Sequence, residues 1–399
     1  DARGGTRVGS GHNHEREQDA PMQKAPHGQG QAGQQPSIRS AEQRRDDYDH
    51  VNLDMLVGLL SITDSQRATQ QNQQDAEAFA AFRTSMGDLE QRARAEEWFL
   101  PIQEVETLER IGQGQCAEVY KVKWRGTYAV SKVLKRAENY KAGWTLATAR
   151  ADLVHEISVL SHLRHPNLVL FLGACIGTDN VSLLNEYMDG GNLEEYVCAL
   201  RSRHPRKGAR VPRKNCARWG IDLAQALTFL HSCNPPVIHR DLKPANLLLC
   251  RQGTLKVGDF GLSSARPRHL NGEAYMMTGR TGTIRYMAPE AMQMDAEGNS
   301  SYNEKVDCYS AAMVLWYMCV ADQPFGDLDA DLIMAGARSG LRPDVSCILR
   351  RHGQLMADTI TKCWESNPTQ RFSAEKLLEC MREHFIFIDE KKKSRGGLP

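Results

Sequence analysis

The pattern of apolar and polar positions marks the start of the chain as different from the rest. Residues 1–40 are rich in Gly, Gln, Arg, His and Pro and hold few apolar side chains, so they cannot bury enough surface to offset the entropy lost on ordering. Apolar positions fit a short helix at 49–62 and recur at spacings of three and four residues within 79–89, as on one helical face. We expect residues 1–100 to be a disordered tail with short regulatory helices, whose apolar face lies on the following domain or binds a partner.

A different pattern begins near residue 101, where strand-like and helix-like segments alternate with short loops. Residues 118–124 and 127–134 are predicted to form two strands joined by a tight turn. Residues 151–163 place four apolar side chains on one face, which predicts a helix. These segments indicate a folded domain over 101–387, followed by a basic, disordered tail at 388–399.

Composition and charge narrow the range of partners. Of the 399 residues, 41% are hydrophobic and 25% are charged, and the formal net charge is +1. Because there is no basic excess, the charge does not indicate nucleic acid or an anionic membrane as the main partner. The longest nearly uninterrupted apolar run, 311–321, is shorter than the roughly 20 residues that a membrane-spanning helix needs. We therefore expect no membrane span.

The cysteines and the N-terminal sequence favour a reducing compartment inside the cell. The chain has 11 cysteines, scattered from Cys116 to Cys380, and no two of them have the C-x-x-C spacing. This spacing disfavours both a disulfide framework and a zinc site. The first residues do not show the charged, apolar and small-residue succession of a secretory signal. We expect a cytoplasmic protein with reduced thiols.

Two glycines lie just before the first predicted strand, in the segment ERIGQGQCAEVY at 109–120. Gly112 and Gly114 would allow the backbone to approach a phosphate closely. A dinucleotide-binding turn would continue into a helix, whereas here a strand follows, so the glycines are expected in a β-hairpin. The second predicted strand carries Lys132, and the predicted helix carries Glu156. If these two side chains pair, they could hold the ammonium group against the phosphates of a nucleotide.

Two segments in the second half of the domain carry the strongest chemical signal: VIHRDLKPANLLL at 237–249 and LKVGDFGLSS at 255–264. Asp241 in the first segment can accept the proton of an attacking hydroxyl group. Asn246 and Asp259 offer the hard oxygen ligands that Mg²⁺ prefers. A loop with only a structural role would not need all three residues at these spacings.

Together with GTIRYMAPE at 282–290, these segments resemble the signature of the eukaryotic protein kinases, and the resemblance covers roughly residues 105–385. Lys243 and Thr283 resemble the serine/threonine-directed branch of the family. The flanking sequences, including HPNLVLFLGAC and GLRPDVS, are similar to the tyrosine-kinase-like group that contains the Raf-like and mixed-lineage kinases.

The resemblance implies an α+β fold with two lobes, a small β-rich lobe at 101–187 and a larger helical lobe at 192–387, with ATP and Mg²⁺ between them. It assigns catalytic roles to Asp241, Lys243 and Lys132. The residues that would bind ATP are, in chain order, Ile111, Gly112, Gly114, Val119, Val130, Lys132, Glu156, Glu186, Met188, Asn246 and Asp259, of which the last two would also hold the metal ion.

The chain departs from the family pattern at several positions around the expected nucleotide. Val130 and Ser131 stand where Ala and Ile are usual, Ala117 replaces the third glycine, and Asn185 occupies the gatekeeper position. These changes keep open a second interpretation, in which a weakly active pseudokinase serves as a signalling scaffold. Against it, the lysine, the glutamate, both aspartates and the asparagine of the expected site are all present.

The resemblance also implies how the protein is switched and what it acts on. Its substrates would be proteins, and an upstream kinase would activate it by phosphorylating Thr278 or Thr281, while Thr283 would align the substrate. Arg240 would pair with the added phosphate, because a phosphate carries about −1.5 to −2 charges and strong acceptor oxygens. Asp307 and Arg371 resemble two structural residues, one that steadies the catalytic loop and one that pairs with the glutamate of the APE element.

Overall fold

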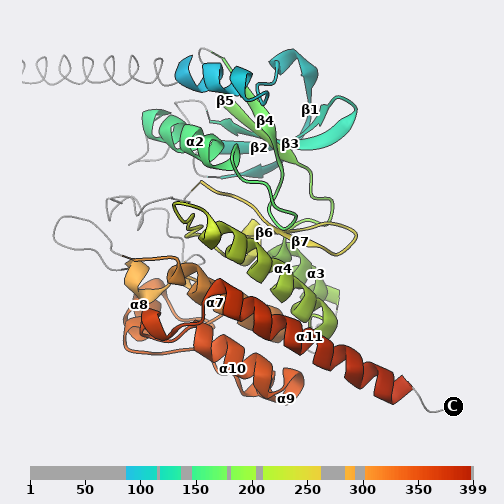
Figure 1. Cartoon of the computed structure of the whole chain (residues 1–399), viewed down its shortest axis with the longest axis vertical. Helices are drawn as coiled ribbons and strands as arrows, with labels where there is room; N and C mark the ends of the chain where they lie inside the picture. Colours follow the sequence, from blue (N-terminus) through green and yellow to red (C-terminus); the bar gives the residue numbers. More distant parts are fainter. Residues whose placement is uncertain are drawn as a thin grey trace, which may run out of the picture. The chain divides into compact units, whose positions relative to one another are not determined.

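The computed structural model describes residues 87–114, 117–135, 146–177, 181–203, 210–261, 284–292 and 302–396 (Figure 1). All of them belong to the second of two units into which the chain divides, Gln71–Pro399. The predicted tail and helices before residue 87 lie outside the described residues. So do Cys116 and three threonines of the expected activation segment, Thr278, Thr281 and Thr283.

A five-stranded antiparallel sheet with the order β1-β2-β3-β5-β4 forms the smaller lobe. Its strands are β1 (Val105–Gln113), β2 (Ala117–Trp124), β3 (Thr127–Leu134), β4 (Phe171–Ile176) and β5 (Val181–Glu186). The two strands predicted at 118–124 and 127–134 are confirmed as β2 and β3. The turn between them has positive φ at both Arg125 (47°) and Gly126 (82°), which suits the right-handed twist of a two-residue hairpin.

Helix α2 (Leu146–Leu160) packs against β3 and β5 and confirms the predicted helix, although it begins and ends earlier than 151–163. Its apolar face includes Leu153, Ile157 and Leu160, which are all buried. At its C-terminal end the backbone turns, with hydrogen bonds from Ser161 N to Ile157 O at 2.9 Å and from Leu163 N to Leu160 O at 3.2 Å. The buried face fixes the rotation of α2, and hence the direction in which Glu156 points.

The larger lobe is mainly helical, so the expected two-lobed α+β fold is confirmed. Its helices are α3 (Leu193–Arg203), α4 (Arg213–Ser232), α7 (Lys305–Val320), α8 (Ala330–Arg338), α9 (Ser346–His352), α10 (Gln354–Cys363) and α11 (Ala374–Gly396). Two short strands, β6 (Leu247–Leu249) and β7 (Leu255–Val257), pair antiparallel. The described part of the chain also has four 3-10 turns: η1 (Ile102–Glu104), η3 (Pro244–Asn246), η4 (Pro289–Met292) and η5 (Pro368–Gln370).

Helix α7 is the centre of the helical lobe and packs against α4, α9 and α10. Every residue from Val306 to Cys319 is buried, as expected for a helix that is apolar on nearly all sides. Two polar residues, Asp307 and Ser310, are buried within it. The apolar run at 311–321 thus belongs to a core helix. Among the described helices, none combines the length and the apolar character that crossing a membrane requires.

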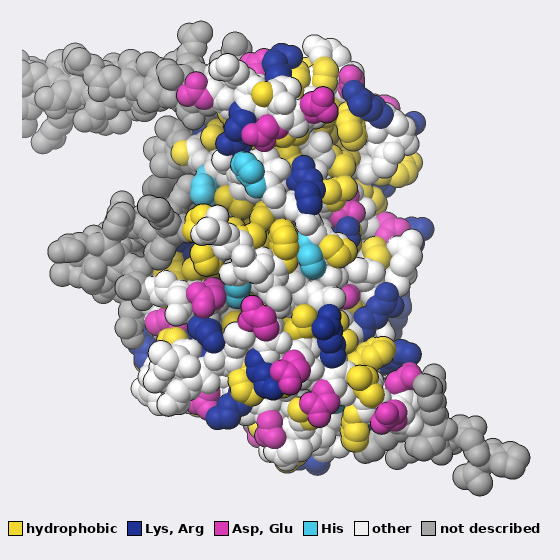
Figure 2. All heavy atoms as spheres, viewed as in Figure 1, with side chains coloured by type: hydrophobic (Ala, Val, Ile, Leu, Met, Phe, Trp, Pro, Cys, Tyr) yellow, Lys and Arg dark blue, Asp and Glu magenta, His cyan; other side chains and the backbone are white. Residues whose placement is uncertain are grey.

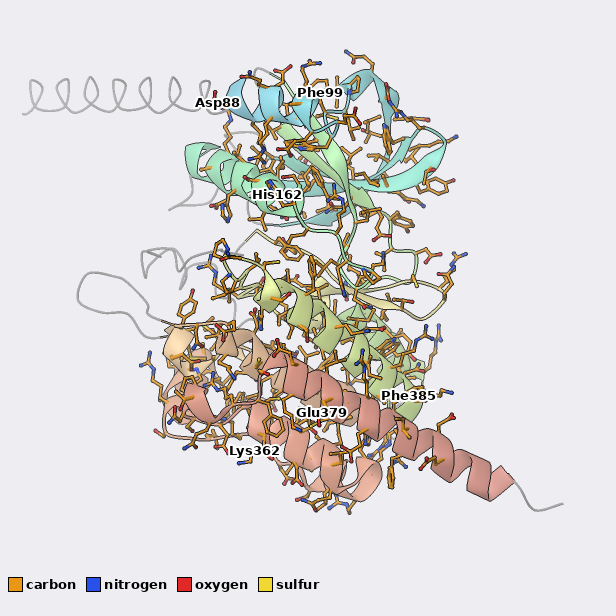
Figure 3. The ribbon with its side chains drawn as sticks, viewed as in Figure 1. Asp88, Phe99, His162, Lys362, Glu379 and Phe385 are labelled. Atoms are coloured by element: carbon orange, nitrogen blue, oxygen red, sulfur yellow. The ribbon has the colours of Figure 1, made fainter. Side chains whose placement is uncertain are left out.

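The folded structure begins before the predicted boundary at residue 101. Residues 87–95 are helical, and Leu89, Ala93 and Trp98 belong to the main hydrophobic core. Arg92 donates hydrogen bonds to Ser158 Oγ and Ser161 Oγ, both at 3.2 Å, next to the end of α2. Figure 3 places Asp88 on this helix and Phe99 just after it, beside the sheet. At least this part of the predicted apolar helix therefore lies on the domain that follows.

The C-terminal end also differs from the sequence-based expectation. A basic, disordered tail was expected at 388–399, but α11 continues to Gly396 and packs along α4. Glu and Lys, which make up much of this segment, favour the helix almost as strongly as Ala. Lys214 on α4 forms an ion pair with Asp389 at 3.5 Å, which anchors this part of α11.

Acidic and basic side chains alternate over the face shown in Figure 2, where neither sign covers a large area. This distribution agrees with the formal net charge of +1. Long-range attraction to a strongly charged partner is therefore not a property of this face.

The contact between the N-terminal helix and the sheet can be tested at Trp98. Its ring packs edge-on against Phe171 at 5.7 Å between centroids, and Nε1 donates to Glu96 Oε2 at 2.8 Å. We expect Trp98→Ala to lower the free energy of unfolding by about 3 kcal/mol, because it leaves a cavity in the core. Chemical denaturation of the full chain measures this. Ile102→Ala, at a residue that is 58% exposed, is the control and should cost less than about 1 kcal/mol.

Candidate active site

The ammonium group of Lys132 lies between two carboxylates from separate elements. Lys132 is on β3, and its Nζ donates to Glu156 Oε2 at 2.7 Å and to Asp259 Oδ1 at 2.9 Å. Glu156 is on α2, and Asp259 follows β7. The structure therefore brings together the expected pair of Lys132 and Glu156. It also places Asp259 in direct contact with the lysine, which the sequence analysis did not predict.

Contact with an opposite charge and burial shift the pKa in opposite directions at each of these three residues. The Lys132 ammonium holds the pKa of Asp259 well below its usual range and outweighs burial. Burial works to lower the pKa of Lys132, but the carboxylates of Asp259 and Glu156 together raise it above its usual value. Burial also raises the pKa of Glu156, and Lys132 opposes this effect. The cluster therefore holds a firmly charged ammonium and, at Asp259, a firmly ionised carboxylate that is 49% exposed.

Asp241 lies on the loop before η3, and two side chains donate hydrogen bonds to one of its carboxylate oxygens. Lys243 Nζ donates to Asp241 Oδ2 at 2.6 Å, and Asn246 Nδ2 donates to the same oxygen at 2.9 Å and to Asp241 O at 2.8 Å. Asp241 Oδ1 is buried without a hydrogen-bond partner among the described residues. Burial raises the pKa of Asp241, while Lys243 acts in the opposite direction. A carboxylate in this state can accept a proton at Oδ1.

The loop that carries Asp241, called here the catalytic loop, is held in place by Asp307 on α7. The backbone N–H groups of His239 and Arg240 each donate to its carboxylate at 2.9 Å, and His231 Nε2 contacts it at 3.0 Å. Asp307 has no solvent exposure, and its hydrogen bonds outweigh burial and keep its pKa below the usual value. Arg240 has φ of 68°, a conformation that costs energy in a residue with a side chain, and the Asp307 contact offsets that cost.

One other expected contact of the helical lobe is present, and Arg240 makes a contact that was not expected. Arg371 forms a two-point ion pair with Glu290, in which Nη2 donates to Oε2 at 2.8 Å. Arg240 Nη1 donates to Tyr302 Oη at 3.1 Å, so this guanidinium has a partner within the helical lobe. Both arginines are buried.

The expected nucleotide-contacting residues of the sheet lie on β1, β2, β3 and β5. Gly112 is on β1 opposite Val119 of β2, and Gly114 N donates to Ala117 O at 2.8 Å, which closes the hairpin end. Ile111 on β1 is 45% exposed. Val130 of β3 lies opposite Asn185 of β5, so two of the unusual residues are neighbours across the strands.

The segment after β5 contains the expected adenine-contacting residues. Glu186 is the last residue of β5, and its Oε1 accepts hydrogen bonds from Lys256 Nζ at 2.5 Å and from Leu170 N at 2.7 Å. Met188 follows two residues later and is buried. The pairing of Lys256 with Glu186 was not predicted, because no motif marks two residues on different strands as partners. Asn185 Oδ1 is buried without a hydrogen-bond partner among the described residues.

Comparison with known proteins supports the resemblance to the protein kinases that the sequence motifs indicate. The family described as protein kinase domain matches residues 105–382. The serine/threonine-protein kinase VIK of Arabidopsis thaliana is 35% identical over 274 residues, which cover 67% of this chain and 57% of VIK. The serine/threonine-protein kinase CTR1 of the same plant is 31% identical over 277 residues, 69% of this chain and 31% of CTR1.

A probable serine/threonine-protein kinase of Dictyostelium discoideum, drkD, is 34% identical over 300 residues, which are 75% of this chain and 21% of drkD. The chain thus spans between about a fifth and somewhat more than half of the length of these relatives. They are consistent with the predicted resemblance to the tyrosine-kinase-like group. Because the family match covers well over half of the sequence, the chain belongs to the protein kinase family.

Proposed function

We propose that the protein is an ATP-dependent serine/threonine kinase that transfers the γ-phosphate of ATP to hydroxyl groups of protein substrates in intracellular signalling. The observation that carries the proposal is the Lys132 ammonium, hydrogen-bonded to both Glu156 and Asp259. A lysine held in this way is ready to neutralise phosphate oxygens, and phosphoryl transfer depends mainly on positioning and charge neutralisation. The serine/threonine kinases among the relatives support the same class of acceptor.

The donor set near Lys132 fits a magnesium ion. Asp259 is a half-exposed carboxylate that the lysine keeps ionised. Asn246, the last residue of η3, offers an amide oxygen. Hard oxygen ligands of this kind suit Mg²⁺, which usually binds through one or two carboxylates together with substrate phosphates. When bound, the ion would neutralise charge on the transferring phosphoryl group. Asn246 and Asp259 would be its protein ligands.

Each of the following residues would have a separate role in phosphoryl transfer. Asp241 Oδ1 would accept the proton of the substrate hydroxyl group. The hydroxyl oxygen would form the new bond to the γ-phosphorus, while the bond between the β- and γ-phosphates breaks and ADP leaves. Lys243, which donates to Asp241 Oδ2 at 2.6 Å, would hold the carboxylate in position and help to neutralise the transferred group. Gly112 and Gly114 would let the hairpin backbone approach the phosphates.

The second candidate is a weakly active pseudokinase that acts as a scaffold. Asn185 supports it to a degree, because an unsatisfied buried amide oxygen beside Val130 changes the polarity at the back of the expected nucleotide site. Against it, Lys132, Glu156 and Asp259 form a contiguous ion-paired group, which a protein without phosphoryl transfer does not need.

Activation by an upstream kinase and a cytoplasmic location remain predictions. Thr278 and Thr281 are the residues that we expect to be phosphorylated, and Thr283 is the residue expected to align the substrate. Phosphopeptide mass spectrometry of active protein tests this directly, since active protein unmodified at both Thr278 and Thr281 would contradict the predicted switch.

A peptide array with varied positions around the acceptor would identify the substrate sequence.

Replacement of the proposed base tests the activity. We expect Asp241→Asn to reduce transfer from radiolabelled ATP, with Mg²⁺ present, at least about 100-fold, because the amide cannot accept the proton. The folded state should persist, since the amide can keep contacts with Lys243 and Asn246. An equally low rate for the parent protein and the variant would instead favour the scaffold.

Replacement of the central lysine tests the nucleotide site. Lys132→Met removes the charge but keeps most of the length, so we expect phosphate transfer to fall about 100-fold or more. Circular dichroism should show that the variant is folded, because burial favours protonation of Glu156 once the ammonium is gone. Lys123→Met, at an exposed lysine of β2, is the matched control and should retain the parent rate. Unchanged activity in the Lys132 variant would contradict the assignment of this site.

A further inference from the structure

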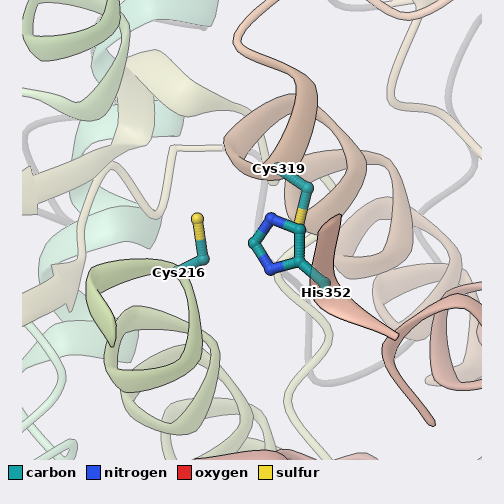
Figure 4. A group of neighbouring side chains, drawn as sticks. All are labelled: Cys216, Cys319 and His352. Atoms are coloured by element: carbon teal, nitrogen blue, oxygen red, sulfur yellow. The ribbon is translucent and has the colours of Figure 1, made fainter. Parts of the chain in front are cut away.

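A second group of chemically reactive side chains lies in the core of the helical lobe. Cys216 is in the first turns of α4, Cys319 is near the C-terminal end of α7, and His352 is the last residue of α9 (Figure 4). The two Sγ atoms and a ring nitrogen of His352 all lie within 4.8 Å of one another. All three residues are buried, and none belongs to the candidate active site.

The imidazole of His352 is buried but makes no hydrogen bond to the described part of the chain. Its exposed fraction is 1%, yet neither ring nitrogen has a hydrogen-bond partner among the described residues. Buried polar groups are almost always satisfied, so a histidine with two unmatched nitrogens calls for a specific explanation, such as a bound ion. Burial lowers the pKa of His352 to about 3, and Arg351 and His384 act in the same direction. The ring is therefore neutral and has a lone pair to offer.

The thiol of Cys216 is held by weak hydrogen bonds. Its Sγ donates to Met318 O at 3.5 Å and to Val211 O at 3.9 Å, and a thiol is a weak donor. A hydrogen bond with Cys216, together with burial, raises the pKa of Cys319 well above its usual value. Arg351 Nη1 donates to Cys319 O at 3.2 Å and opposes that shift.

The geometry points to a structural zinc site held by Cys216, Cys319 and His352. Thiolate sulfur and imidazole nitrogen are the donors that Zn²⁺ prefers, at about 2.3 Å and 2.0–2.1 Å. Tetrahedral bonds of these lengths place ligand atoms roughly 3.4–3.8 Å apart, so the three side chains need to close by about 1 Å at most. Zn²⁺ displaces one proton from each thiol to solvent, and two thiolates balance the charge of the ion without any oxidation or reduction.

A fourth donor lies beside this group on α11. His384 is 1% exposed, and neither of its ring nitrogens has a hydrogen-bond partner among the described residues. Its ring centroid lies 6.1 Å from that of His352, and burial lowers its pKa to about 4. Structural zinc sites are almost always four-coordinate, and His384 would complete a Cys₂His₂ set if its side chain turned toward the ion. The ion would then join four helices: α4, α7, α9 and α11.

The spacing of the ligands explains why the sequence indicated no zinc site. The zinc sites that a sequence can reveal have ligands two to five residues apart, whereas these four come from four different helices. The ordinary interpretation of Cys216 and Cys319 alone would be that of small apolar residues in a core. That interpretation leaves two buried imidazoles unexplained. Neither His352 nor His384 has a hydrogen-bond partner among the described residues, and a ring nitrogen of His352 lies within 4.8 Å of both sulfurs.

Metal content and zinc titration test the site in the full chain. Protein purified without chelator should contain about one zinc per chain by mass spectrometry of the metal. After removal of metal and reduction of the thiols, it should take up Zn²⁺ in competition with a chromophoric chelator. Free Zn²⁺ at 100 times its dissociation constant should raise the melting temperature by about 5 °C or more. Co²⁺ in place of Zn²⁺ should give the charge-transfer absorption of thiolate ligands.

Variants separate the site from a general effect on folding. The double variant Cys216→Ser/Cys319→Ser should lose the zinc and the cobalt absorption, and His352→Phe, which keeps a ring in place, should weaken zinc binding at least about 10-fold. Cys175→Ser, at a buried cysteine of β4, should keep both. If the double variant does not fold, the titration of the parent protein decides the question. Parent protein that takes up no Zn²⁺ at micromolar concentration, or that carries a Cys216–Cys319 disulfide, would overturn the proposal.

Discussion

The ion-paired group centred on the Lys132 ammonium is the constraint on which the rest of the smaller lobe depends. Glu156 is almost fully buried, and a buried carboxylate is costly unless an opposite charge contacts it closely. The pair forms only if α2 lies on the sheet with one particular rotation, which its buried apolar face provides. Asp259 adds the requirement that the loop after β7 also reaches β3. One ammonium group therefore links the sheet, its helix and the first loop of the helical lobe.

The helical lobe fixes the position of the loop that carries His239, Arg240 and Asp241, in which Arg240 has a strained backbone conformation. Asp307 accepts the backbone N–H groups of two successive loop residues, and it projects from a helix that is buried on every side. Such a helix cannot rotate without disturbing the whole core. The position of Asp241, two residues after His239, is thus determined by packing that lies beneath the loop. The proposed zinc ion would bind near the opposite end of the same helix, at Cys319.

Local patterns in the sequence predicted the local structure well. The hairpin of β2 and β3, the helix α2 and the catalytic loop could be inferred because periodicity, turn residues and motifs act over a few positions. Contacts between distant positions were harder to infer. Lys132 and Asp259 are separated by 127 positions and Lys256 and Glu186 by 70, and only the folded chain brings them together. The zinc ligands were missed for the same reason.

The C-terminal end of the domain was misjudged for another physical reason. Its polar and charged composition was taken to indicate disorder, but packing on a neighbouring element can order a segment of helix-forming residues, as it does for α11 along α4. At the N-terminal end a helix was predicted, but the boundary of the domain was placed after it, at residue 101, whereas Leu89, Ala93 and Trp98 belong to the core. A short charged segment therefore has to be judged together with the surface that it can cover.

The packing of Leu89, Ala93 and Trp98 into the core has a practical consequence for any shortened version of this protein. A fragment cut at residue 105, where the family match begins, would lack all three side chains and would expose the apolar surface of Phe171 to water. It would also lose Arg92, which holds Ser158 and Ser161 beside the end of the helix that carries Glu156. Fragments for expression or crystallisation should therefore begin no later than Gly87.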